Sequence, residues 1–124
     1  MSSTSPVGAF LAKLVTTSLA VLIVAHLLPG VTIDSALSAI GLAIVLAILN
    51  VFIKPLLVLL TLPITVVTLG LFLIVINALM ILLADELVPG FAVDGFWWAV
   101  LFSFILTLVV SVLESIQIAA SGRE

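Results

Sequence analysis

The sequence contains no cysteine and very few charged residues. The absence of cysteine excludes disulfides, zinc–thiolate sites and thiol nucleophiles. Charged residues make up only 7% of the 124 positions, whereas a soluble domain carries about 25%. So few charges cannot cover a water-facing surface, and the composition therefore argues against a soluble domain.

Recognisable sites for chemistry or for nucleic acid are also missing from the sequence. The three basic residues, Lys13, Lys54 and Arg123, form no basic patch for nucleic acid and no polybasic run for anionic lipid. No nucleophile–base set, phosphate loop or metal-ligand cluster is present. We therefore expect no enzyme, no cofactor, no metal and no nucleic-acid partner.

Hydrophobic residues, by contrast, make up 65% of the chain, and the mean hydropathy is +1.65. The apolar runs exceed the roughly 18 residues that indicate a membrane-spanning helix. The sequence predicts a single all-α integral membrane domain over 1–124, in contact with the lipid bilayer. It has about four transmembrane helices, which we place at Val7–Leu28, Ala36–Ile53, Ile64–Leu87 and Gly95–Ile118.

The chain also repeats itself at an offset of 60 residues, which places Pro89 on Pro29, Gly90 on Gly30 and Asp94 on Asp34. Chance rarely produces these three residue types at one spacing. We predict a tandem two-helix repeat, with one copy at about 7–53, a connection at 54–65 and a second copy at about 66–118. Because a two-helix unit returns to its starting side, the copies are expected to be parallel.

Each copy carries a Pro-Gly loop between its two helices. Proline cannot continue a helix and glycine tolerates the turn, so Pro29-Gly30 and Pro89-Gly90 are expected to end the first helix of each copy. Asp34 and Asp94 follow where an N-cap would satisfy the first free N–H groups of the next helix.

Basic and acidic residues separate to opposite ends of the predicted spans. All three basic residues lie at the end that holds both termini, while the other end carries Asp34, Asp85, Glu86 and Asp94. Basic residues are retained in the cytoplasm, so both termini are expected to be cytoplasmic and both loops external. The outer interface is expected to hold Phe91, Phe96, Trp97 and Trp98.

Small residues recur every four positions, which places them on one helix face and lets backbones approach closely. The faces are Gly8, Ala12, Thr16, Ala20; Ser35, Ala39, Ala43, Ala47; and Ala99, Ser103, Thr107, Ser111, Ser115, with a sparser one of Gly70 and Asn77. We expect these faces to pack a tight bundle and leave flanking leucines such as Leu42 and Leu101 to lipid. The Ser/Thr face of the last span would also suit a pore lining.

The connection after Lys54 is apolar and contains Pro55 and Pro63, each of which interrupts helical hydrogen bonding. Two shapes fit this segment. One is a short helix or hairpin at 55–65 that lies in the inner interface or re-enters the membrane. The other is a long, kinked second helix that turns at Pro63.

Four polar residues in or beside the predicted spans are candidate functional or structural positions: Asn50, Lys54, Asn77 and Glu114. Intramembrane polar groups are costly and often functional, although asparagine also bridges neighbouring helices. Glu114 falls on Lys54 at the repeat offset, so the two are expected at similar depth. Lys54 would then either pair with Glu114 or extend to lipid phosphates.

Several motifs together resemble one family. They are Asn50-Val-Phe-Ile-Lys54-Pro55, Thr61-Leu-Pro63-Ile-Thr65, Thr68-Leu-Gly70, Ile76-Asn77-Ala78 and Val88-Pro89-Gly90-Phe91. Over residues 10–115 the chain is similar to the small bacterial membrane proteins of the phage holin family, mycobacterial phage holin superfamily IV type. The resemblance implies a bacterial inner-membrane protein and hole formation by oligomerisation, and makes Asn50, Lys54, Pro55 and Asn77 the candidate functional positions.

Three functions follow from these observations. The first is a non-catalytic accessory or envelope-stress membrane protein, working as a homo-oligomer or as a subunit of a larger membrane complex. The second is a holin-type protein that permeabilises the cytoplasmic membrane, as the resemblance implies. The third is a minimal transporter or channel, which the parallel repeat suggests.

Overall fold

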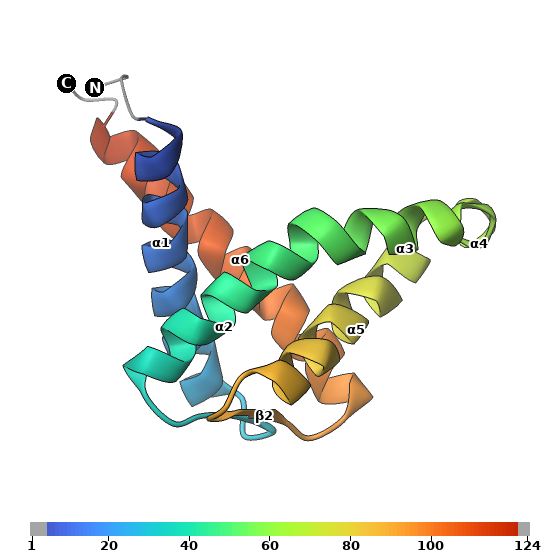
Figure 1. Cartoon of the computed structure of the whole chain (residues 1–124), viewed down its shortest axis with the longest axis horizontal. Helices are drawn as coiled ribbons and strands as arrows, with labels where there is room; N and C mark the ends of the chain where they lie inside the picture. Colours follow the sequence, from blue (N-terminus) through green and yellow to red (C-terminus); the bar gives the residue numbers. More distant parts are fainter. Residues whose placement is uncertain (1–4, 122–124) are drawn as a thin grey trace.

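The computed structural model describes residues 5–121, most of which are helical (Figure 1). Helix α1 (Pro6–Leu27) is followed by strand β1 (Val31–Ile33), helix α2 (Ala36–Ile48), the π-helical turn η1 (Leu49–Ile53), and helices α3 (Lys54–Leu60) and α4 (Leu62–Val67). Helix α5 (Phe72–Leu87), strand β2 (Phe91–Val93) and helix α6 (Phe96–Ser121) complete the order.

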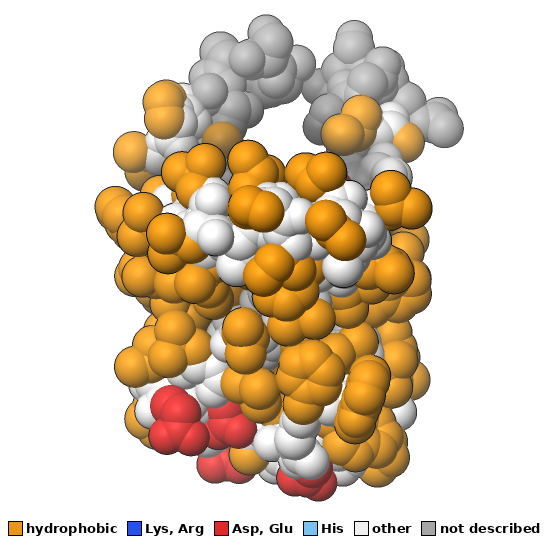
Figure 2. Space-filling model, turned by 90° about the vertical axis from the view of Figure 1, so that its right-hand side faces the viewer, with side chains coloured by type: hydrophobic (Ala, Val, Ile, Leu, Met, Phe, Trp, Pro, Cys, Tyr) orange, Lys and Arg blue, Asp and Glu red, His pale blue; other side chains and the backbone are white. Residues whose placement is uncertain are grey.

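Three helices in the described part of the chain are long and apolar enough to cross a membrane: Pro6–Leu27, Ala36–Leu60 and Phe96–Ala120. Hydrophobic side chains cover most of the face shown in Figure 2, and acidic side chains gather at its lower end. The predicted helical membrane protein is therefore confirmed. Helix α5 has 16 residues and reaches only about 24 Å. It begins at Phe72, later than the predicted Ile64, because a turn intervenes.

Two arms diverge from the end of the molecule that holds the strands (Figure 1). One arm contains α1 and α6, and the other contains α5 and the continuous helix α2–η1–α3. At the base, β1 and β2 pair antiparallel with Thr32 opposite Ala92. The N–H of Asp34 donates to the carbonyl of Gly90, and the N–H of Asp94 donates to that of Gly30, both at 2.8 Å. Each of these two bonds becomes the other when 60 is added to or subtracted from its residue numbers.

Each Pro-Gly loop packs against the second helix of the other half. A Cβ atom at Gly30 would overlap the indole ring of Trp98, and one at Gly90 would overlap the hydroxyl of Ser38. Trp98 and Ser38 are counterparts at the repeat offset. Gly90 also has a φ of +86°, which favours glycine. The backbone of each Pro-Gly loop therefore packs closely against a helix of the other half, at positions that correspond at the repeat offset.

This close approach makes Gly30→Ala a destabilising change. Overlap with a packed indole is expected to lower the free energy of unfolding by about 1–3 kcal/mol. Gly41→Ala is the matched control, because its nearest neighbour would be Val88 Cγ1 at 3.8 Å, and alanine favours a helix by up to about 1 kcal/mol. Thermal unfolding in detergent, followed by circular dichroism, measures both. Equal melting temperatures would contradict the loop packing.

The predicted helix caps are wrong by one residue in each half. The side chain of Ser35, not Asp34, caps α2 by accepting from the N–H of Ser38 at 3.2 Å. Before α6, the carbonyl of Gly95 accepts the helical bond from the N–H of Ala99 at 3.0 Å, so Gly95 and not Asp94 stands at the cap. The prediction did not include the two strands, after which each helix cap falls one residue later. The backbone N–H groups of Asp34 and Asp94 donate hydrogen bonds across the two loops, and their side chains do not cap the helices.

The core lies near the strands, where the two arms meet. Ala39, Ala99 and Phe102 are fully buried there. Phe91 is buried too, with its ring centroid 5.6 Å from that of Phe102. Its predicted place at the membrane interface is wrong, because alternation along β2 turns Phe91 and Val93 inward. Trp97, by contrast, is 78% exposed.

The small-residue faces are buried only in their halves near the strands. There the buried members are Thr16, Ala20, Ala39, Ala43 and Ala99. Leu42, which the sequence assigned to lipid, is also fully buried and belongs to the core. Gly70 is not on a helix face at all, since it lies in the turn before α5 with a φ of +88°. Away from the strands the arms separate, and Ala47, Ser103, Thr107 and Ser111 line cavities between them.

The connection has the second of its two predicted shapes, a long second helix, but it turns later than expected. Pro55 lacks an N–H and its ring crowds the carbonyl four residues back. The preceding turn widens to the π-helical η1, in which the N–H of Lys54 reaches the carbonyl of Leu49. Helix continues to Leu60, Pro63 falls in the first turn of α4, and the chain reverses through Leu69 and Gly70.

Candidate functional site

Two adjoining cavities, which we together call the polar cleft, lie between the arms. The first, of about 240 Å³, is lined by α1, α2, η1 and α6, and its polar residues are Lys13, Thr17, Asn50, Thr107, Ser111 and Glu114. The second, of about 220 Å³, involves α5 instead of α1, and its polar residues are Asn50, Lys54, Asn77, Ser103 and Thr107. Leu46, Asn50, Leu106 and Thr107 line both.

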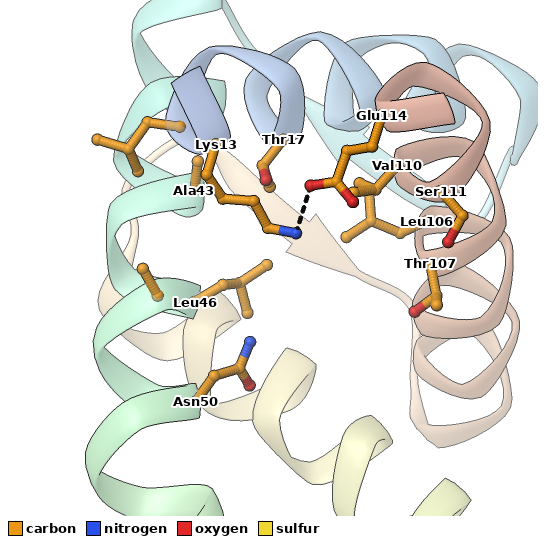
Figure 3. A pocket seen from close by; sticks show the side chains of 12 residues that line it. Lys13, Thr17, Ala43, Leu46, Asn50, Leu106, Thr107, Val110, Ser111 and Glu114 are labelled. Carbon is orange, nitrogen blue, oxygen red and sulfur yellow. Dashed lines mark hydrogen bonds and ion pairs between the residues drawn. The ribbon is translucent and has the colours of Figure 1, made fainter. Parts of the chain in front are cut away.

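An ion pair dominates the first cavity. Lys13 on α1 and Glu114 on α6 point toward each other, and their Nζ and Oε2 atoms are 2.7 Å apart (Figure 3). The two side chains are 55% and 38% exposed. One turn further along each helix, the amide of Gln117 donates to the hydroxyl of Thr16 at 2.7 Å. These two contacts join α1 to α6 on the side away from the strands.

Glu114 therefore does not pair with Lys54, and that alternative for Lys54 is wrong. At the repeat offset the two residues are counterparts in different halves, so they lie at similar positions of different cavities. Lys54 is half-buried and lines the second cavity. Within residues 5–121 it has no carboxylate partner. Asn50 and Asn77 make no side-chain hydrogen bond to that part of the chain either.

The turn η1 presents two of these groups to the same space. Asn50 lies within η1 and Lys54 directly follows it, and residues four apart share a helix face. Wide π-helical turns of this kind occur often at functional sites. Pro55, one of the predicted functional positions, is itself exposed. Its role in the structure is to force the wide turn that precedes it.

Apolar side chains close the polar cleft toward the strands. Leu46 and Leu106, counterparts at the repeat offset, line both cavities and are themselves buried. One turn nearer the strands, Leu42 and Phe102 are fully buried. The polar lining thus gives way to packed core toward the strands.

Most of the polar residues predicted from the sequence meet in this cleft. It holds Asn50, Lys54, Asn77 and Glu114, together with Ser103, Thr107 and Ser111 of the last small-residue face. The pairing of Lys13 with Glu114 could not be predicted from the sequence, because the two residues are 101 positions apart. The loop residues Pro29, Gly30, Asp34, Pro89, Gly90 and Asp94 lie at the strand end instead. Arg123 is outside the described residues.

Comparison with known proteins identifies the relatives of this architecture. Residues 8–112 match the family described as mycobacterial 4 TMS phage holin, superfamily IV. The chain belongs to this family. It is 45% identical over 84 residues to the uncharacterized protein SCO3922 of Streptomyces coelicolor, covering 64% of this chain and 67% of that protein. It is 41% identical over 92 residues to the uncharacterized membrane protein YvlD of Bacillus subtilis, covering 73% and 77%.

No solved structure gives a significant match to the chain. The family description specifies four transmembrane segments, whereas three helices of the described residues meet the length and hydropathy of a span and α5 is shorter. Neither the family description nor the names of the relatives indicates a catalytic activity.

Proposed function

We propose that this chain is a non-catalytic, non-lytic accessory protein of the bacterial cytoplasmic membrane, which works as an oligomer or as a subunit of a larger membrane complex. The observation that carries the proposal is the closed floor of the polar cleft. Leu46 and Leu106 are buried in its lining, and fully buried Leu42 and Phe102 follow one turn nearer the strands. The polar lining of the cleft therefore does not continue through one copy to its strand end, and a water-filled path would have to form between copies.

The arm formed by α3, α4 and α5 supplies a surface for such assembly. Its outer end exposes the apolar side chains of Leu59, Leu60, Val66, Val67, Leu69 and Leu71. In a bilayer these side chains contact lipid or another helix with little difference in hydrophobic free energy, so shape decides which they meet. A projecting hairpin can fit beside a second copy or beside a larger partner.

The charge distribution supports an orientation with both termini in the cytoplasm. Lys13 lies in the half of α1 away from the strands, and Lys54 begins α3, whereas the strand end carries Asp34, Asp85, Glu86 and Asp94. Basic residues favour the cytoplasmic side. We further propose that residues 7–53 and 66–118 are parallel copies, related by a twofold axis along the membrane normal and together spanning the membrane four times.

Graded expression in a bacterium tests the non-lytic role. Cells producing the chain at moderate level are expected to keep their membrane potential, because a single copy encloses no polar path through its core. A potential-sensitive dye and viable counts are followed during induction, beside the oligomer size of the purified protein. The Lys54→Ala variant, induced in parallel, is expected to leave the potential equally intact and to alter the oligomer size or partner binding.

Holin activity is the second candidate, and the family description favours it. A holin accumulates and then opens lesions abruptly at a critical concentration. Abrupt depolarisation that depends on expression level and is lost in Lys54→Ala would establish this role and exclude the accessory one.

A further inference from the structure

The two cavities of the polar cleft are counterparts of each other. Thr17 of the first corresponds at the repeat offset to Asn77 of the second, Ala43 corresponds to Ser103, and Leu46 corresponds to Leu106. Most residues that line the second cavity are counterparts of residues that line the first. The two cavities can therefore be compared position by position.

They differ in charge. In the first cavity the carboxylate of Glu114 is neutralised by Lys13 at 2.7 Å. At the repeat offset the counterpart of Glu114 is Lys54, which lines the second cavity, and the counterpart of Lys13 is Leu73. The position that holds a counter-ion in one half thus holds a leucine in the other. Lys54 is the one charged residue that lines the second cavity, and no described residue neutralises it.

The second cavity also contains hydrogen-bond donors without acceptors. The hydroxyls of Ser103 and Thr107 donate to carbonyls of their own helix, at 3.1 and 2.9 Å. The ammonium of Lys54 and the side-chain amides of Asn50 and Asn77 have no such acceptor within residues 5–121. Polar groups without partners are costly inside a bilayer, and a charged group is the most costly. An anion with several acceptor oxygens would satisfy all three groups at once.

We propose that the second cavity binds the phosphate of an anionic lipid headgroup, taken from the leaflet at the open end of the polar cleft. Phosphate supplies a negatively charged partner for Lys54 and acceptor oxygens for the side-chain amides of Asn50 and Asn77. The surroundings favour a lipid as its source, because exposed apolar side chains of α3 and α5, such as Leu56 and Ile74, lie on the helices that line the cavity. The acyl chains would lie along these faces.

Native mass spectrometry of the purified full-length protein, titrated with phosphatidylglycerol or with zwitterionic phosphatidylcholine, tests this site. The wild type is expected to retain phosphatidylglycerol about tenfold more strongly, as one charge-assisted interaction allows. Lys54→Met is expected to remove this preference and Lys54→Arg to keep it. The matched control is the double variant Lys13→Met with Glu114→Gln. It removes the ion pair of the first cavity without changing the net charge, and is expected to stay within about twofold of wild type.

The amides give a second measurement that does not depend on the charge. Asn50→Leu and Asn77→Leu are each expected to weaken phosphatidylglycerol binding about threefold. Unchanged binding in Lys54→Met, or equal retention of the two lipids by the wild type, would overturn the site. Displacement of the lipid by millimolar inorganic phosphate would assign the cavity to a free anion and overturn the lipid. Loss of self-association in Lys54→Met without loss of lipid would assign the cavity to a second copy.

Lipid binding would occur whether or not the protein permeabilises membranes. A result against the non-lytic role in cells therefore leaves this binding experiment unaffected. A failure to bind lipid likewise leaves the expression experiment in cells unaffected. If Lys54→Met fails to fold, as judged by its melting temperature, Lys54→Arg and the two asparagine variants still decide between the outcomes.

Discussion

A cysteine introduced at Thr32 or Ala92 is expected to react with a membrane-impermeant maleimide added to intact cells, whereas one at Ser3 or Ser121 is expected not to react. Thr32 and Ala92 lie opposite each other in the two strands, and both are exposed. The acidic residues near them and the distant lysines favour an external strand end. Because the chain has no native cysteine, each variant carries a single reactive group. The difference between the two pairs should be nearly all-or-none.

Two controls separate sidedness from accessibility. In permeabilised cells the Ser3 and Ser121 variants, whose side chains are outside the described residues, should react as well. Val31→Cys, adjacent to Thr32 but buried, should react slowly in both conditions. If Ser3→Cys reacted from outside and Thr32→Cys did not, the proposed orientation would be wrong. The lysines would then not lie on the cytoplasmic side.

The sequence predicts the helices well because the bilayer leaves few alternatives. Apolar runs this long must satisfy their backbone hydrogen bonds internally, and a helix does so. It predicts strands β1 and β2 poorly, since three residues pair only when the two loops meet from distant parts of the chain. The signal was nevertheless present. In each loop two apolar residues flank one position that any residue type can occupy. In the first loop Val31 and Ile33 flank Thr32, which is the alternation of a half-buried strand.

The partner of Glu114 could not be found from the repeat alone. Counterparts related by a twofold axis are separated by twice their distance from the axis, so only residues near it touch their own counterparts. Thr32 pairs with its counterpart Ala92, and Leu46 and Leu106 line the same two cavities. Lys54 and Glu114 lie in different cavities, and Glu114 instead binds Lys13 of the neighbouring helix. A sequence repeat therefore predicts which positions correspond, and it does not predict that corresponding residues touch.

The predicted end of the second helix is wrong because of the way Pro55 is accommodated. Pro55 suggested an interruption, yet the helix passes through it by widening the preceding turn into η1. The cost is limited because proline removes one donor and the wider turn moves the crowded carbonyl away. The same widened turn borders Asn50 and Lys54, so the feature that obscured the boundary also shapes the candidate site.

Phe102→Ala is expected to cause the largest loss of stability among these variants. Phe102 is fully buried, its ring is 5.6 Å from that of Phe91, and it lies beneath the floor of the polar cleft. In water-soluble proteins such a truncation costs about 3–5 kcal/mol. Here the unfolded chain keeps its side chains in lipid or detergent, so the transfer part is small and the cavity part remains. We therefore expect a loss of about 3 kcal/mol in the free energy of unfolding.

Phe104→Ala is the matched control, because it removes the same atoms two positions further along α6. Phe104 is 61% exposed, so lipid or detergent fills the space it leaves, and the change is expected to stay below about 1 kcal/mol. Unfolding of both variants in mixed detergent micelles, followed by circular dichroism, gives the comparison. Similar losses at the two positions would mean that α6 does not pack its Phe102 face against the rest of the bundle. The closed floor on which the non-lytic role depends would then be lost as well.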